Sequence, residues 1–202
     1  MTSAGRPLPL ILASTSASRQ ALLRGAGLTF TFEAAGIDER ALEAGLAGAS
    51  PTDVALALSD AKALAVSARR PGAIVIGADQ TLSLGASCFH KPANQADARE
   101  KLLALRGQTH RLNSGIACAR DGEILYHRVV GAEMTMRLFS DACLDWYLGV
   151  AGENVLRSVG CYQLEGPGIQ LFERIDGDYF TILGLPLMPL LAALRDLGVI
   201  HD

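Results

Sequence analysis

Asp79 follows residues 73–77, a continuous apolar run that is typical of a strand buried on both faces. A carboxylate at the end of such a strand faces the crevice where open α/β sheets bind ligands. There Asp79 could hold a metal ion or accept a proton from water. A cap or turn role is the alternative, but apolar residues rather than a helix follow Asp79, which favours the site interpretation.

A hydroxyl-rich turn, Ser-Thr-Ser-Ala-Ser-Arg at residues 14–19, separates an apolar run at 8–13 from a predicted helix that begins near Gln20. The first N–H groups of a helix lack intrahelical partners, and the helix dipole is positive there. Hydroxyls and one arginine at such a junction suit a phosphate group. Ser16 or Ser18 could equally act only as a helix cap, so these residues alone leave both interpretations open.

Two lysines and an acidic pair add to this set. Lys91 directly precedes a predicted helix at 93–105, where its ammonium could meet a phosphate, although a single loop lysine is by default a solvated charge. Lys62 lies on a predicted long helix and could reach a phosphate or remain solvated. Asp38 and Glu39, in a predicted loop, could support a divalent cation, although acidic pairs also occur on plain surfaces.

A glycine-punctuated loop at residues 160–168 carries one acid, Glu165. Glycine lets the backbone approach a ligand closely, and a carboxylate could accept the N–H groups of a purine edge. The alternative is a tight turn into the next strand. Trp146 is interpreted as a core residue.

Predicted strands and helices alternate before a strand-rich middle, which indicates an α/β or α+β domain around a mixed sheet, taken as one domain over residues 1–202. An Asp121-Gly122 hairpin signal joins two of the strands. The predicted strands are 8–13, 30–33, 73–77, 112–119, 123–130, 132–137 and 169–175, and the predicted helices after the first are 51–70, 93–105, 140–149 and 187–197.

The bulk composition narrows the class of function. Net charge is −3, which argues against a surface that coats nucleic acid. No apolar run approaches the ~20 residues that span a bilayer, and no signal peptide is recognised, so we expect a cytoplasmic protein without a membrane partner. The four cysteines are widely spaced, which indicates reduced residues rather than a zinc site or a disulfide framework.

The ordered set of segments resembles the Maf family of nucleotide pyrophosphatases over nearly the whole chain. No phosphate-binding GxxxxGK[ST], GxGxxG, HExxH or GxSxG motif competes with it. The segments that carry the resemblance are residues 10–16 with Arg19, Asp38-Glu39, Lys62, 76–79, Lys91-Pro92, 105–110, Arg137, Tyr162 with Glu165-Gly166, and 184–187.

The resemblance implies an α/β fold like that of inosine triphosphate pyrophosphatases: a mixed, twisted central sheet flanked by helices, with a cleft between two lobes. It implies a homodimer that hydrolyses a nucleoside triphosphate to the monophosphate and pyrophosphate with a divalent cation, Mg²⁺ or Mn²⁺. Position by position, it implies that Asp79 activates water and that Glu39 supports the metal. The implied phosphate contacts are Ser16, Arg19, Lys62 and Lys91.

Three further positions are implied to set base preference: Ser18, Gln80 and Glu165. Gln80 and Glu165 resemble the branch that acts on 7-methyl-GTP, whereas the dTTP and UTP branch typically has Arg, Thr and Gln at the three positions. Ala17 replaces the usual Pro, Ser18 is neither the Arg nor the aromatic residue expected, and His90 replaces a Gly, while 157–160 departs from the customary Lys-Ala-Gly. A dTTP/UTP pyrophosphatase and a nucleotide-binding regulator of septum formation or cell division remain the alternative functions.

Overall fold

The computed structural model describes residues 8–201. Within this range the chain divides into two compact units. The first takes residues 8–79, 114–129 and 184–201, and the second takes 80–113 and 130–183. The three long strands contribute residues to both units: β3 (Ile74–Leu84), β5 (Thr109–Arg120) and β6 (Glu123–Met136).

The strands form a mixed sheet, as the sequence predicts. Among the described residues its order is β2-β1-β3-β5-β6-β7, and β4 pairs with β3 outside this path. Strand β1 (Leu10–Leu12) is parallel to β2 (Thr31–Phe32) and to β3. The pairs β3–β4 and β6–β7 are antiparallel. Parallel pairs in one part of the sheet and antiparallel pairs in another confirm the predicted fold class.

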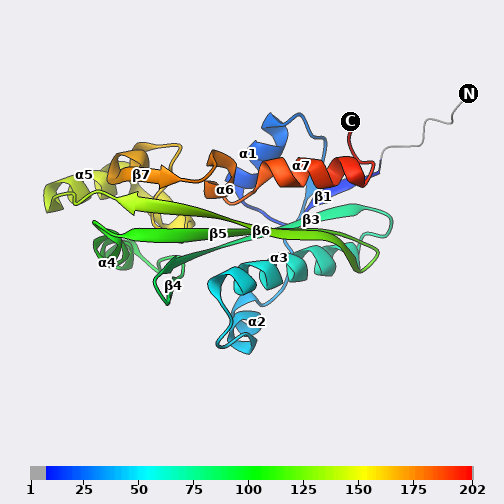
Figure 1. The fold of residues 1–202 in the computed structure, drawn as a ribbon, viewed down its shortest axis with the longest axis horizontal. Helices are drawn as coiled ribbons and strands as arrows, with labels where there is room; N and C mark the ends of the chain where they lie inside the picture. The colour runs from blue at the N-terminus through cyan, green and yellow to red at the C-terminus, as the bar shows by residue number, and fades with distance from the viewer. Residues whose placement is uncertain (1–7, 202) are drawn as a thin grey trace, which may run out of the picture. The chain divides into compact units, whose positions relative to one another are not determined.

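Helices cover both faces of the sheet in the first unit (Figure 1). One face carries α3 (Pro51–Ser67) and α2 (Glu39–Gly45), and the other carries α1 (Ala17–Gly25) and α7 (Leu187–Asp196). Parallel strands buried between helices are expected to be apolar throughout. The buried core accordingly includes Ile11, Val75 and Val66.

Helix α3 packs directly on the backbone of the sheet at two glycines. A Cβ atom added to Gly77 would lie 2.1 Å from the carbonyl oxygen of Ser59, and one added to Gly115 would lie 2.4 Å from that of Ala55. Both distances are far shorter than a van der Waals contact. The two glycines therefore fix how closely α3 approaches β3 and β5.

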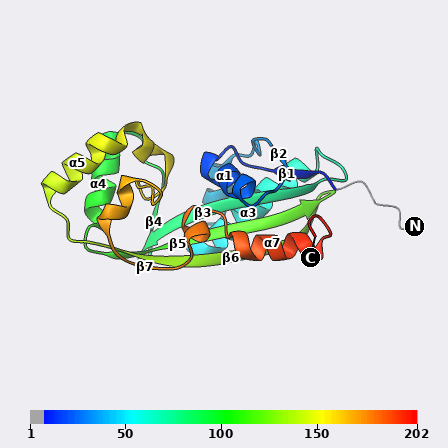
Figure 2. The same ribbon diagram turned by 90° about the horizontal axis from the view of Figure 1, so that it is seen from above.

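The second unit packs its helices around one apolar core. Helices α4 (Gln95–Leu105) and α5 (Asp141–Ala151) lie side by side (Figure 2) and bury Leu102 and Tyr147 among other residues. The remaining elements of this unit are β4 (Ser87–Phe89), β7 (Phe172–Asp176), α6 (Tyr179–Ile182) and the 3₁₀ helices η1 (Gly152–Arg157) and η2 (Pro167–Leu171).

Several predicted element bounds are wrong. Strand β3 continues to Leu84, because its later residues pair with β4. Residues 123–136 form one strand instead of two, because Gly131 stays within the strand. A Cβ atom added to Gly131 would lie 2.3 Å from Nη2 of Arg111, so the glycine leaves room for that guanidinium. Residues 167–171 form a 3₁₀ helix, so β7 begins only at Phe172.

The Asp121-Gly122 turn is confirmed, since both residues have positive φ (52° and 84°), as a type I′ hairpin requires. Trp146 is not a core residue: it lies on α5 with 42% of its surface exposed, while Tyr147 beside it is buried. In residues 8–201, no helix has the length and apolar character needed to span a membrane.

Candidate active site

The turn after β1 begins with a helix cap. Ser16 is the N-cap of α1, and its Oγ accepts a hydrogen bond from the backbone N–H of Arg19 at 3.5 Å. The N–H of Ser16 in turn donates to Oγ of Ser14 at 3.2 Å. The cap interpretation of this segment is confirmed. Ser18, in the first turn of the helix, is half-buried.

The Arg19 side chain turns back from α1 and binds the ends of other segments. Its Nε donates to the carbonyl of Gly184 at 2.8 Å, and its Nη1 donates to the carbonyl of Ala78 at 2.8 Å and to Oγ of Ser14 at 3.3 Å. Within residues 8–201 no hydrogen bond involves Nη2. Arg19 therefore joins the start of α1 to β3 and keeps one nitrogen for another anion.

Burial and charge act on Arg19 in opposite directions. Loss of solvent lowers the pKa of the guanidinium, while the negative charges of Asp79 and Glu39 oppose that shift. A buried cation is tolerated when carboxylates and carbonyl oxygens surround it. The Arg19 guanidinium and the two acids therefore interact electrostatically.

Asp79 lies in the middle of β3 rather than at its end, which corrects the sequence interpretation. The parallel neighbour β1 ends at Leu12, which pairs with Ile76, so Asp79 lies past the end of β1. Beyond that pair β3 has no partner in β1. The Asp79 side chain is only 11% exposed.

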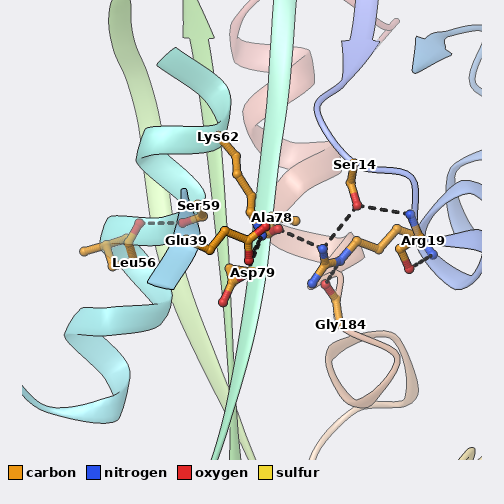
Figure 3. A network of polar contacts seen from close by, with 10 residues as sticks. Ser14, Arg19, Glu39, Leu56, Ser59, Lys62, Ala78, Asp79 and Gly184 are labelled. Atoms are coloured by element: carbon orange, nitrogen blue, oxygen red, sulfur yellow. Dashed lines mark hydrogen bonds and ion pairs between the residues drawn. The ribbon is translucent and has the colours of Figure 1, made fainter. Parts of the chain in front are cut away.

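Lys62 connects the two acids of the first unit (Figure 3). Its Nζ lies 2.6 Å from Oδ1 of Asp79 and 2.9 Å from Oε2 of Glu39. The Lys62 side chain is 9% exposed, so it is not a solvated surface charge. Close packing of α3 at Gly77 carries Lys62 to the level of Asp79 on β3.

The two acids of the pair, Asp38 and Glu39, have different roles. Asp38 caps α2, since its side chain accepts from the N–H of Ala41 at 3.0 Å. Glu39 is the first residue of α2 and not part of a loop, and this helix start directs it toward Lys62. Asp38 is therefore a structural residue, and Glu39 alone joins the cluster.

Asp79 and Glu39 present the hard carboxylate oxygens that Mg²⁺ and Mn²⁺ prefer. The described residues include no group of three or more His, Cys, Asp or Glu that could hold a metal ion by themselves. Mg²⁺ is commonly held by one or two carboxylates together with substrate phosphates. Two carboxylates that meet at one cation, here the Lys62 ammonium, fit that kind of site.

Three predicted residues belong to the second unit. Gln80 Nε2 donates to the carbonyls of Thr181 and Ile182, at 3.1 Å each, and so connects β3 to α6. Lys91 is exposed between β4 and α4. Because Asn94 caps α4 and the helix starts at Gln95, Lys91 lies further from the helix start than the sequence predicts. Glu165 is exposed.

A buried histidine without an assigned role supports the loop that carries Glu165. His110 Nε2 lies 2.7 Å from the hydroxyl of Tyr162, and Nδ1 has no hydrogen-bond partner among the described residues. Burial lowers the pKa of His110 to about 4 and raises that of Tyr162, so the hydrogen bond joins two uncharged groups. A Cβ at Gly160 would lie 2.3 Å from the Tyr162 ring, so only glycine admits this packing.

The sequence contains a signal for that pair: His110 and Leu112 alternate with polar residues along β5 and therefore face the core. The carbonyl of Gly184, by contrast, has no sequence signal, because it acts through its backbone.

Comparison with known proteins gives a consistent result. Residues 9–197 match the family described as Maf-like protein. The chain is 57% identical to a 7-methyl-GTP pyrophosphatase of Mesorhizobium japonicum, which it matches over 95% of its own length and 97% of the relative's. It is also 57% identical to a 7-methyl-GTP pyrophosphatase of Brucella suis, over 92% and 94%. A protein of Bradyrhizobium diazoefficiens named nucleoside triphosphate pyrophosphatase has the same identity, over 93% of each chain.

Proposed function

The chain belongs to the Maf family, and from this premise we propose that it hydrolyses a nucleoside triphosphate to the monophosphate and pyrophosphate, with 7-methyl-GTP as the preferred substrate. The observation that carries the proposal is the cluster of Asp79, Lys62, Glu39 and Arg19 in one unit, in which Asp79 and Lys62 are buried. It offers a carboxylate base and two cations to a polyanionic substrate.

Asp79 is the base in this proposal. In this structure its Oδ1 accepts from Lys62, and within residues 8–201 Oδ2 has no hydrogen bond, so Oδ2 is the oxygen that can accept from a water molecule. Oδ2 accepts a proton from water as the water oxygen bonds to the α-phosphorus, and the bond from the α-phosphorus to the oxygen that bridges the α- and β-phosphates breaks. The bridging oxygen leaves with the pyrophosphate.

The proposed phosphate contacts differ in how far their side chains can move. Arg19 is held by carbonyls and offers only Nη2, so it acts as a fixed donor. Lys62 has a flexible stem and can exchange a carboxylate for a phosphate oxygen. Ser16, at the positive end of α1, and Lys91 of the second unit complete the proposed set.

Asp79 and Glu39 would hold a divalent cation, Mg²⁺ or Mn²⁺, together with the substrate phosphates. Such an ion neutralises charge that develops on phosphate oxygens during transfer.

The base preference is assigned to Glu165, with Gln80 and Ser18 as accompanying positions. A carboxylate accepts from the N1–H and the amino group of guanine, a donor pair that pyrimidines lack. The exposed Glu165 belongs to the loop that also carries Tyr162, whose hydroxyl is hydrogen-bonded to the buried His110, and a loop held in this way suits a residue that must discriminate between bases. Two of the relatives reported above are named for 7-methyl-GTP, which supports this choice.

The protein is further proposed to act in the cytoplasm as a homodimer without a nucleic-acid partner. Its net charge of −3 supports the last point.

Pyrophosphate release from 7-methyl-GTP, GTP, UTP and dTTP, each with Mg²⁺ or Mn²⁺, tests the proposal. We expect the highest kcat/KM for 7-methyl-GTP and no turnover in excess chelator. A preference for UTP and dTTP would overturn the proposed base preference. Tight nucleotide binding without product over hours would overturn hydrolysis and favour a nucleotide-binding regulator.

A further inference from the structure

Lys62 occupies the place where a divalent cation would meet the two acids of the site. Its ammonium contacts Asp79 Oδ1 at 2.6 Å and Glu39 Oε2 at 2.9 Å, and it is the group that bridges them (Figure 3). The two carboxylates come from different elements, β3 and the start of α2. The two carboxylates thus lie around one cation position, and a side chain of the protein fills it.

An ammonium and a metal ion exclude each other at this position. Mg²⁺ binds carboxylate oxygens at about 2.0–2.1 Å, inside the shell that the Lys62 nitrogen now occupies. The two cations also repel each other at such a separation. A metal ion that uses both Asp79 and Glu39 therefore requires the Lys62 ammonium to leave.

The Lys62 side chain can move although its helix cannot. Helix α3 is fixed on β3, because the Ser59 carbonyl lies where a Cβ of Gly77 would be. The lysine side chain, by contrast, has a flexible four-carbon stem and carries a compact charge that binds phosphate well. Arg19 cannot substitute for this movement, since carbonyls hold its Nε and Nη1.

We infer that Lys62 keeps the divalent-cation position closed until a triphosphate arrives, so that metal and nucleotide enter the site together. The phosphates draw the ammonium away from Asp79 and Glu39, and the two carboxylates then become available to the metal ion. This inference rests on the metal-dependent hydrolysis proposed above. The alternative is a lysine that remains between the acids throughout as a fixed counter-ion.

Titration of the full-length protein with Mn²⁺ alone, followed by electron paramagnetic resonance of the free ion, tests the inference without any turnover. Lys62→Met removes the charge and keeps most of the stem. We expect the variant to bind Mn²⁺ at least tenfold more tightly than the wild type in the absence of nucleotide. Adding Glu39→Gln to Lys62→Met should abolish the gain, which would place the ion at the two carboxylates.

Lys101→Met is the matched control, because Lys101 pairs with Asp97 on α4 in the second unit and contacts neither acid of the site. It should leave Mn²⁺ binding unchanged. Wild-type protein that binds Mn²⁺ as tightly as Lys62→Met, with no nucleotide present, would overturn the inference.

A second measurement does not depend on the variant's folding. A non-hydrolysable triphosphate analogue should raise the Mn²⁺ affinity of the wild type at least tenfold, and Mn²⁺ should raise the analogue's affinity by the same factor. Equal Mn²⁺ affinity with and without the analogue would contradict joint entry. Failure of the proposed function is seen separately, as hydrolysis that persists unchanged in excess chelator or as no pyrophosphate from any nucleotide.

Discussion

At the scale of single residues, Asp79 is the position where the smallest change should have the largest effect. Asp79→Asn keeps the shape and an oxygen for Lys62 but removes the negative charge that accepts a proton. Loss of a general base typically lowers rates by about 10²–10⁴-fold. We expect a fall of this size in kcat for 7-methyl-GTP, measured by pyrophosphate release, with the thermal unfolding midpoint little changed. A variant with wild-type kcat would exclude Asp79 as the base.

Glu165 should control selectivity more than rate. In Glu165→Gln one carboxylate oxygen becomes an N–H donor, which opposes the donor pair of guanine. We expect kcat/KM for 7-methyl-GTP to fall by about tenfold or more, while that for UTP falls less. The measurement is the ratio of the two kcat/KM values. An unchanged ratio would remove Glu165 from base recognition.

What the sequence reveals of these residues depends on how they act. Asp79, Lys62 and Glu39 are recognisable by type and order, but the sequence cannot show that Lys62 bridges two acids from separate elements. Arg19 was predicted as a phosphate contact, yet three of its hydrogen bonds go to Ala78, Gly184 and Ser14. Such contacts arise from tertiary packing, which residue spacing does not encode.

At the scale of elements, the contact between α3 and β3 positions the cluster. Gly77→Ala places a Cβ 2.1 Å from the Ser59 carbonyl, so the helix must shift. Overpacking of this kind costs typically ~1–3 kcal/mol. We expect a loss of about 2 kcal/mol in the free energy of unfolding in urea, and a lower kcat because Lys62 moves with α3.

Gly149→Ala is the matched control for that variant. Gly149 lies inside α5, and nothing lies within 4 Å of an added Cβ. Alanine there should leave stability unchanged or raise it slightly, since glycine disfavours helix interiors. Equal stability of the two variants would show that α3 does not depend on close approach at Gly77.

The elements were predictable where local chemistry defines them, and not where pairing does. Residues 51–70 and 140–149 have clear starts, and in the structure Ser50 caps α3 and Ser140 caps α5. The extension of β3 to Leu84 depends on its pairing with β4, which the local pattern of apolar residues does not reveal. Helix α2 has no buried residue, so its sequence lacks the apolar side by which helices are recognised.

At the scale of the whole molecule, His110 links stability to pH. Its pKa is about 4 in the folded protein, against 6.5 for an unperturbed imidazole, because burial disfavours the charged ring. The unfolded chain therefore takes up a proton first as pH falls. The stability that neutral His110 provides is complete above pH 6.5 and is lost progressively down to pH 4, by about 3 kcal/mol in total.

We expect the free energy of unfolding of the wild type to decrease by about 2 kcal/mol more than that of His110→Gln between pH 7.5 and pH 5. Glutamine can still form a hydrogen bond with the Tyr162 hydroxyl, as donor or acceptor, but does not titrate. His127→Gln is the control, since His127 is half exposed beside Asp60. If wild type and His110→Gln lost stability in parallel, another group would carry the pH dependence.

The exposed position of Trp146 makes the chain's single tryptophan an optical reporter of one unit. Fluorescence excited at the indole band follows the surroundings of α5 alone, whereas far-ultraviolet circular dichroism averages over every helix and strand. Coincident denaturation curves from the two signals would show that both units unfold in a single transition. Curves that separate would show that the two units unfold independently and would give the free energy of unfolding of each unit.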